Sequence, residues 1–76
     1  MSVEKFATEL ANAIDADPSI VGADTVYKNL DCWDSMGALS VIAMIDESYS
    51  VSIGGDDLEG TSTVAELFAV VEKRMA

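Results

Sequence analysis

The segment Asp34-Ser35-Met36 is the part of this 76-residue chain whose residue types could support chemistry. It stands at the start of an apolar stretch that is expected to form a helix. If Asp34 is the N-cap, its carboxylate accepts a hydrogen bond from the N–H of Met36 or Gly37, and Ser35 begins the helix with its hydroxyl exposed. A helix N-terminus favours a phosphate on that hydroxyl, because free N–H groups and the helix dipole attract negative charge. The sequence therefore predicts that another enzyme modifies Ser35.

The chain offers few groups for catalysis or metal binding of its own. It contains no His, so it has neither a Ser-His pair nor the usual zinc ligands. Cys32 lacks the cationic neighbour that a reactive thiol needs, and we expect a small, partly buried residue. Asp56, Asp57 and Glu59 suit helix capping better than a calcium loop, which spreads its ligands over about twelve residues around a central Gly. We therefore expect neither an enzyme nor a metal site.

The hydrophobic spacing predicts the elements that position Ser35. They are a helix over about 2–16, a long connection over 17–34, a helix over 35–49, a one-turn helix over 56–59 and a last helix over 64–75. Ser2 is the expected cap of the first helix, and Asp17-Pro18 its expected end. Asp56 is the expected cap of the short helix, and Thr63 with Glu66 has the capping-box pattern of the last one. This is an all-α, four-helix bundle with three main helices, one short helix and a long first loop.

The helix over 35–49 is apolar on more than one side. The residues expected to be buried share one face: Ala38, Leu39, Ile42, Ile45 and Tyr49. The opposite face has Gly37, Ser40, Met44 and Glu47, flanked by Met36 and Ala43. Such an apolar outer face in a small domain predicts a contact surface.

These motifs resemble the acyl carrier protein family over nearly the whole chain. Asp34-Ser35-Met36 stands where the family has its Asp-Ser-Leu motif, and Trp33 precedes it, as in many free-standing bacterial members. Acids and an aromatic residue follow one helix later, in Asp46-Glu47-Ser48-Tyr49. Thr61-Ser62-Thr63-Val64 matches the start of the last family helix.

The resemblance implies a carrier function. In that family a transferase attaches 4′-phosphopantetheine from coenzyme A to the motif serine, and the acyl group is held on the thiol of this arm as a thioester. Ser35 is then the attachment site, and partner enzymes of a fatty-acid- or polyketide-like pathway load, process and unload the acyl group. The residues expected to be recognised by the transferase and other partners are Asp34, Met36, Ala43, Met44, Asp46 and Glu47.

One departure from the family pattern bears on the pathway. Fatty-acid synthase carriers usually have acids two and five positions after the serine, where this chain has Gly37 and Ser40. We infer that partner proteins recognise the apolar residues of this helix as much as its charge. The departure favours a dedicated pathway carrier. Two alternatives stay open: an aminoacyl carrier of the D-alanyl type, which also resembles the Asp-Ser-Met form, and an unmodified acidic interaction module.

The charge of the chain excludes some partners and favours others. Fourteen acidic residues against four basic ones give a net charge of −10, and residues 29–72 contain no Lys or Arg. Such a charge repels nucleic acid and anionic membranes and attracts basic proteins. Residues 1–5 lack the pattern of a signal peptide, and no stretch approaches the ~20 apolar residues of a membrane span. We expect a single cytoplasmic domain over 1–76 that is monomeric and does not insert into membranes.

Overall fold

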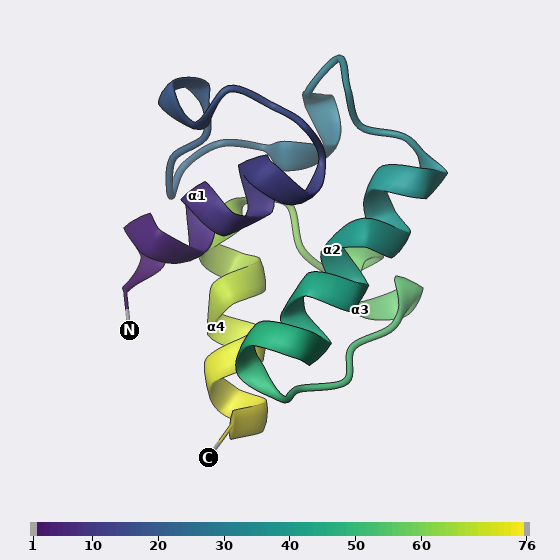
Figure 1. The fold of residues 1–76 in the computed structure, drawn as a ribbon. Helices are drawn as coiled ribbons and strands as arrows, with labels where there is room; N and C mark the ends of the chain where they lie inside the picture. Colours follow the sequence, from purple (N-terminus) through teal and green to yellow (C-terminus); the bar gives the residue numbers. More distant parts are fainter. Residues whose placement is uncertain (1, 76) are drawn as a thin grey trace.

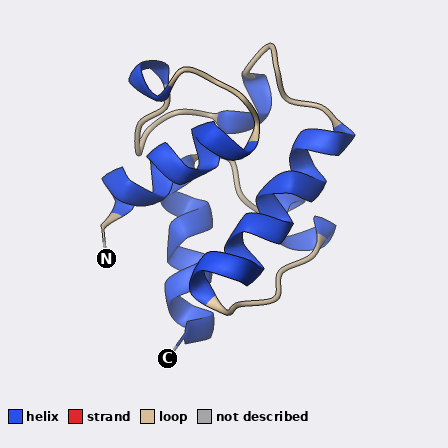
Figure 2. Cartoon of the chain, in the orientation of Figure 1, coloured by secondary structure: helices blue, strands red, loops and turns tan. Residues whose placement is uncertain are grey.

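The chain forms a bundle of helices around one core (Figure 1). A computed structural model describes residues 2–75. Its helices are α1 (Val3–Ala13), α2 (Ser35–Tyr49), α3 (Gly55–Glu59) and α4 (Val64–Met75), with the 3₁₀ turns η1 (Pro18–Ile20) and η2 (Tyr27–Asn29) between α1 and α2. Figure 2 shows helices and loops only, and the described residues form no strand beyond one isolated bridge, between Val26 and Thr63. The predicted all-α class is confirmed, and no helix of residues 2–75 has the length and apolarity to span a membrane.

The three main helices meet through fully buried side chains. They include Phe6 and Leu10 from α1, Val41 and Ile45 from α2, and Leu67 and Val71 from α4. The Phe6 ring lies 5.1 Å from that of Phe68 and 5.7 Å from that of Tyr49. Tilted aromatic pairs at this spacing add to the stabilisation from burial alone. This cluster fixes α2, and so the position of its first residue, against both other helices.

Helix α1 begins where predicted but ends early. The Ser2 hydroxyl accepts a hydrogen bond from the Lys5 N–H, as expected of the N-cap. The helix stops at Ala13 rather than near residue 16, because Asp15 has a left-handed backbone with φ of 62°. The Ala16 N–H then donates to the Ala11 carbonyl at 2.8 Å, which closes a Schellman-type end.

Tyr27 attaches the long first loop to α3 and the residues that follow it. This side chain is fully buried, and its hydroxyl lies 3.0 Å from the Leu58 carbonyl and 2.7 Å from the Thr61 hydroxyl. The Trp33 ring packs edge-on against the Tyr27 ring at 5.1 Å, so Trp33 covers the edge of the core. Not every apolar residue of the loop is buried, since Ile20 is 59% exposed.

Helix α2 has the predicted bounds but a different buried face. Its buried residues are Gly37, Val41 and Ile45, while Leu39, expected in the core, is 66% exposed. Gly37, expected on the outer face, packs against α1. The prediction was wrong because apolar residues occur around most of this helix, so their spacing does not identify one face.

The last two helices differ from prediction only at single residues. In α3 the N-cap is Gly54 rather than Asp56, and its N–H donates to the Asp57 carboxylate at 3.0 Å. The capping box of α4 is confirmed, since the Thr63 N–H donates to Glu66 at 2.9 Å and the Glu66 N–H to the Thr63 hydroxyl at 3.2 Å. Met75, the last residue of α4, is exposed.

Candidate functional site

The loop before α2 ends in a well-formed helix cap. The Asp34 carboxylate accepts a hydrogen bond from the Gly37 N–H at 2.7 Å, and the Ala38 N–H donates to the Asp34 carbonyl at 3.0 Å. Ser35 is the first residue of the helix and is exposed. The local geometry expected from Asp34-Ser35 is therefore present, with the serine hydroxyl accessible to another protein.

Gly37 lets the N-terminus of α2 approach the end of α1 closely. A Cβ at this position would lie 3.3 Å from Cγ2 of Ile14 and 3.4 Å from the capping oxygen of Asp34. The position two residues after Ser35 therefore faces the core in this chain. An acidic side chain there would point at Ile14 and not at a partner.

The surroundings of Ser35 suit a phosphate group. At a helix N-terminus the first backbone N–H groups have no partner within the helix, and the dipole favours negative charge. Asp34 satisfies the N–H of Gly37, which leaves those of Ser35 and Met36 at the start of the helix. A phosphate on the Ser35 hydroxyl would lie next to these donors, so the residues present fit a phosphate-linked arm.

The Asp34 carboxylate is engaged by the Gly37 N–H, and no group of three or more metal-ligating side chains occurs among residues 2–75. Cys32, expected to be partly buried, is exposed. It lies in the two-residue turn at residues 31–32, just before Trp33.

An exposed apolar stripe follows Ser35 along the outer side of α2. Met36 is 76% exposed and Leu39 66% exposed, and Ala43 and Asp46 continue the row at spacings of three and four residues. Met36, Ala43 and Asp46 were among the expected recognition residues. Leu39 was missed, although its spacing from Met36 and Ala43 places it on the same face.

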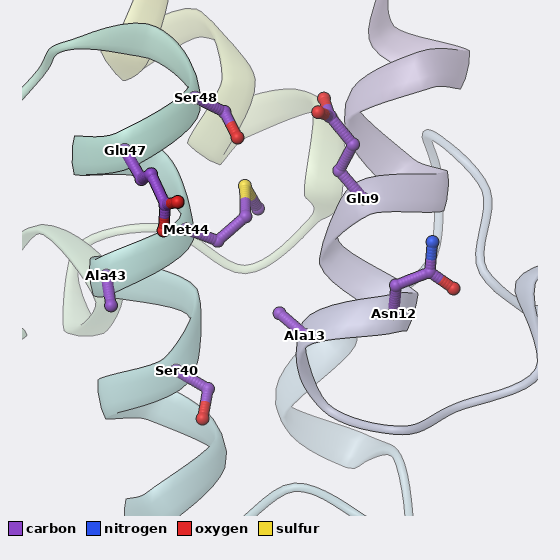
Figure 3. Close-up of a pocket in the computed structure, with 8 residues that line it drawn as sticks. All are labelled: Glu9, Asn12, Ala13, Ser40, Ala43, Met44, Glu47 and Ser48. Carbon is purple, nitrogen blue, oxygen red and sulfur yellow. The ribbon is translucent and has the colours of Figure 1, made fainter.

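The remaining expected recognition residues lie on other parts of α2. Asp34 is the cap, while Met44 and Glu47 line an open groove of about 520 Å³ between α1 and α2. Figure 3 shows this groove, which is lined by Glu9, Asn12, Ala13, Ser40, Ala43, Met44, Glu47 and Ser48. Apart from Asp34, the predicted recognition residues therefore occupy two adjoining surfaces, the exposed stripe and the groove.

Comparisons with known proteins bear on the family. No family model matches the chain. The acyl carrier protein of Phytoplasma australiense is 26% identical over 76 residues, which is the whole of both chains. The solution NMR structure of a holo acyl carrier protein from Geobacter metallireducens superposes with a TM-score of 0.77 at 19% identity, covering 96% of this chain and 84% of that one.

The NMR structure shows that the fold is shared, and the relative shows that sequence similarity extends from end to end. Together they confirm the resemblance to the acyl carrier protein family, whose members are carriers and not enzymes.

Proposed function

We propose that this protein holds acyl intermediates as thioesters on a 4′-phosphopantetheine arm attached to Ser35. The observation that supports the proposal best is the exposed Ser35 hydroxyl at the first position of α2, capped by Asp34. The chain is similar to an acyl carrier protein, and the resemblance to that family implies that a transferase modifies the serine at this position.

In this arrangement the chain and its cofactor have different roles. The arm supplies the thiol on which an acyl group is held. The chain exposes Ser35 at a fixed place, because the core residues of α2 attach the helix to α1 and α4. Its helix N-terminus stabilises the negative phosphate. A base for deprotonating the Ser35 hydroxyl must come from the transferase, since the Asp34 carboxylate already caps the helix.

The exposed stripe of α2 supports a docking role. Exposed Met36 and Leu39 lie close to Ser35 in the sequence and offer apolar contact area, and Asp46 adds charge at the far end. Burial of apolar area is the main favourable term in most protein association, while exposed charges mainly raise the association rate. We infer that the transferase and acyl-processing enzymes bind this stripe through mixed apolar and basic surfaces.

For the pathway, we propose only a general class. A fatty-acid- or polyketide-like pathway accords with the family, and the missing acids at the second and fifth positions after Ser35 favour a dedicated pathway. An aminoacyl cargo uses the same arm and the same serine. Loading assays with an acyl-activating and an amino-acid-activating partner would separate the two cargoes.

Intact-mass measurement tests the attachment of the arm. The protein is incubated with coenzyme A and a broad-specificity phosphopantetheinyl transferase, with Ser35→Ala in parallel and Ser62→Ala as a matched exposed serine. We expect one adduct on the wild type and on Ser62→Ala, and none on a folded Ser35→Ala. An unmodified wild type would instead favour the acidic interaction module.

A further inference from the structure

The groove between α1 and α2 has a carboxylate on each wall. Glu9 of α1 and Glu47 of α2 line it, together with the apolar side chains of Ala13, Ala43 and Met44 (Figure 3). In Figure 3 the Met44 side chain extends between the two helices. No basic residue is among the eight that line the groove.

Tyr49 holds the α1 wall in place. Its hydroxyl donates a hydrogen bond to Oε1 of half-buried Glu9. Burial raises the pKa of Tyr49, and the hydrogen bond to Glu9 raises it further, so Tyr49 stays a donor at neutral pH. Glu9 is therefore a positioned acceptor in the groove and not a freely rotating surface side chain.

The lining suits a long basic side chain better than other occupants. The methylene groups of Lys or Arg pack on apolar surface while the charged end stays near carboxylates. An acyl chain in the same place would remove carboxylates from water without pairing them, which is unfavourable. The net charge of −10 favours a basic occupant further.

We propose that the groove receives a lysine or arginine side chain from the enzyme that docks on α2, the transferase included, so that Glu9 makes α1 part of the recognition surface. The inference rests on the proposed function, which defines that enzyme. Ala43 belongs to both the exposed stripe and the groove, so a protein bound along the stripe has the groove directly beside it.

Loading kinetics with matched charge variants test the proposal. Glu9→Gln removes the charge and keeps an acceptor for Tyr49, while Glu4→Gln removes the same charge from an exposed position on the same helix outside the groove. For loading by the transferase, we expect Glu9→Gln to raise KM about three- to fivefold and leave kcat unchanged, since an exposed pair contributes up to ~1 kcal/mol. Glu4→Gln should stay within about twofold. Equal KM values for the two variants would overturn the proposal.

A small-molecule probe tests the groove without any enzyme. Methyl NMR spectra are recorded during titration with N-acetyl-arginine methylamide and, as a neutral match, N-acetyl-norleucine methylamide. We expect saturable shifts of the Ala13, Ala43 and Met44 methyl signals with the arginine compound only, and their loss in the double variant Glu9→Gln/Glu47→Gln. Identical responses to both compounds would contradict a cation site.

The NMR spectra and the loading assays together distinguish the other outcomes. If the acylated protein alone shifts these methyl signals, the groove is a cargo site and the proposal is wrong. A wild type that accepts no arm contradicts the proposed function, and the arginine titration then decides on the groove. A loaded wild type whose KM is insensitive to Glu9 contradicts the groove proposal and leaves the carrier function standing.

Discussion

At the scale of single residues, Asp34 prepares the position of Ser35. Its carboxylate accepts from the Gly37 N–H at 2.7 Å, which sets the first turn of α2 and the direction of the serine. This cap was predictable because Asp is a favoured N-cap and an apolar helix follows it. The close approach of Gly37 to Ile14 was not predictable, because it depends on where α1 ends in space.

Removing the Asp34 cap should lower the stability of the fold. Asp34→Ala leaves the Gly37 N–H without its acceptor, and we expect a loss of about 1 kcal/mol in the free energy of unfolding. In a domain of this size this corresponds to a fall in Tm of about 4–8 °C. Thermal melts followed by circular dichroism give the value.

Asp34→Asn is the control for this prediction. It retains a side-chain oxygen that can cap the helix, so its Tm should stay close to that of the wild type. If Asp34→Ala melted at the wild-type temperature as well, the cap would not stabilise α2.

At the scale of elements, helix bounds were predicted better than helix faces. The predicted bounds of α2, Ser35–Tyr49, agree with the structure at both ends. Asp34 caps the start of the helix, and Ser50 ends it with a left-handed backbone and φ of 55°. The end of α1 was missed because its left-handed residue is Asp15, where Gly is the usual signal. The buried face of α2 was missed because apolar residues surround this helix.

Two substitutions on α2 separate its buried face from its exposed stripe. Ile45 is fully buried, so Ile45→Ala should cost about 2–5 kcal/mol of unfolding free energy. Leu39 is 66% exposed, so Leu39→Ala should change stability by less than about 0.5 kcal/mol. Urea unfolding measures both values.

The same Leu39 variant tests the docking role of the stripe. Leu39→Ala should raise KM for loading of Ser35 although the fold is intact, because an apolar anchor is lost. A large loss of stability in Leu39→Ala would show that Leu39 lies in the core, as its sequence spacing first indicated. An unchanged KM would remove it from the docking surface.

At the scale of the whole molecule, the acidic charge affects stability in two opposite ways. The chain has a pI of about 4.1, so mutual repulsion of its carboxylates at neutral pH disfavours the compact state. Other carboxylates stabilise the fold locally. A hydrogen bond from the Ser19 N–H lowers the pKa of Asp17. The Gly54 N–H, and after it Arg74, lower the pKa of Asp57. The N–H groups of Thr63 and Ser62 lower the pKa of Glu66. Arg74 also joins α4 to α3 through its 2.6 Å ion pair with Asp57.

The lowered pKa values of Asp17, Asp57 and Glu66 predict a loss of stability at acidic pH. Groups with lowered pKa values bind fewer protons in the folded state, so their contribution is present above their ordinary values near pH ~4 and is lost as the pH falls through the folded values. Below about pH 4, Tm should fall.

Melting curves between pH 3 and 8 measure this profile. Glu66→Gln should flatten the fall at acidic pH, because it removes one of the groups whose pKa is lowered. A Tm that stays level or rises down to pH 3 would show that these carboxylate hydrogen bonds do not stabilise the fold.

The attachment of the arm to Ser35 is tested most directly by fragment-ion mass spectrometry of the loaded protein. Residues 29–72 contain no Lys or Arg, so trypsin leaves Ser35 and several other serines in one long peptide, and fragmentation must locate the adduct within it. We expect phosphopantetheine on Ser35 alone. An adduct on any other serine, or none after incubation of the folded protein with coenzyme A and the transferase, would contradict it.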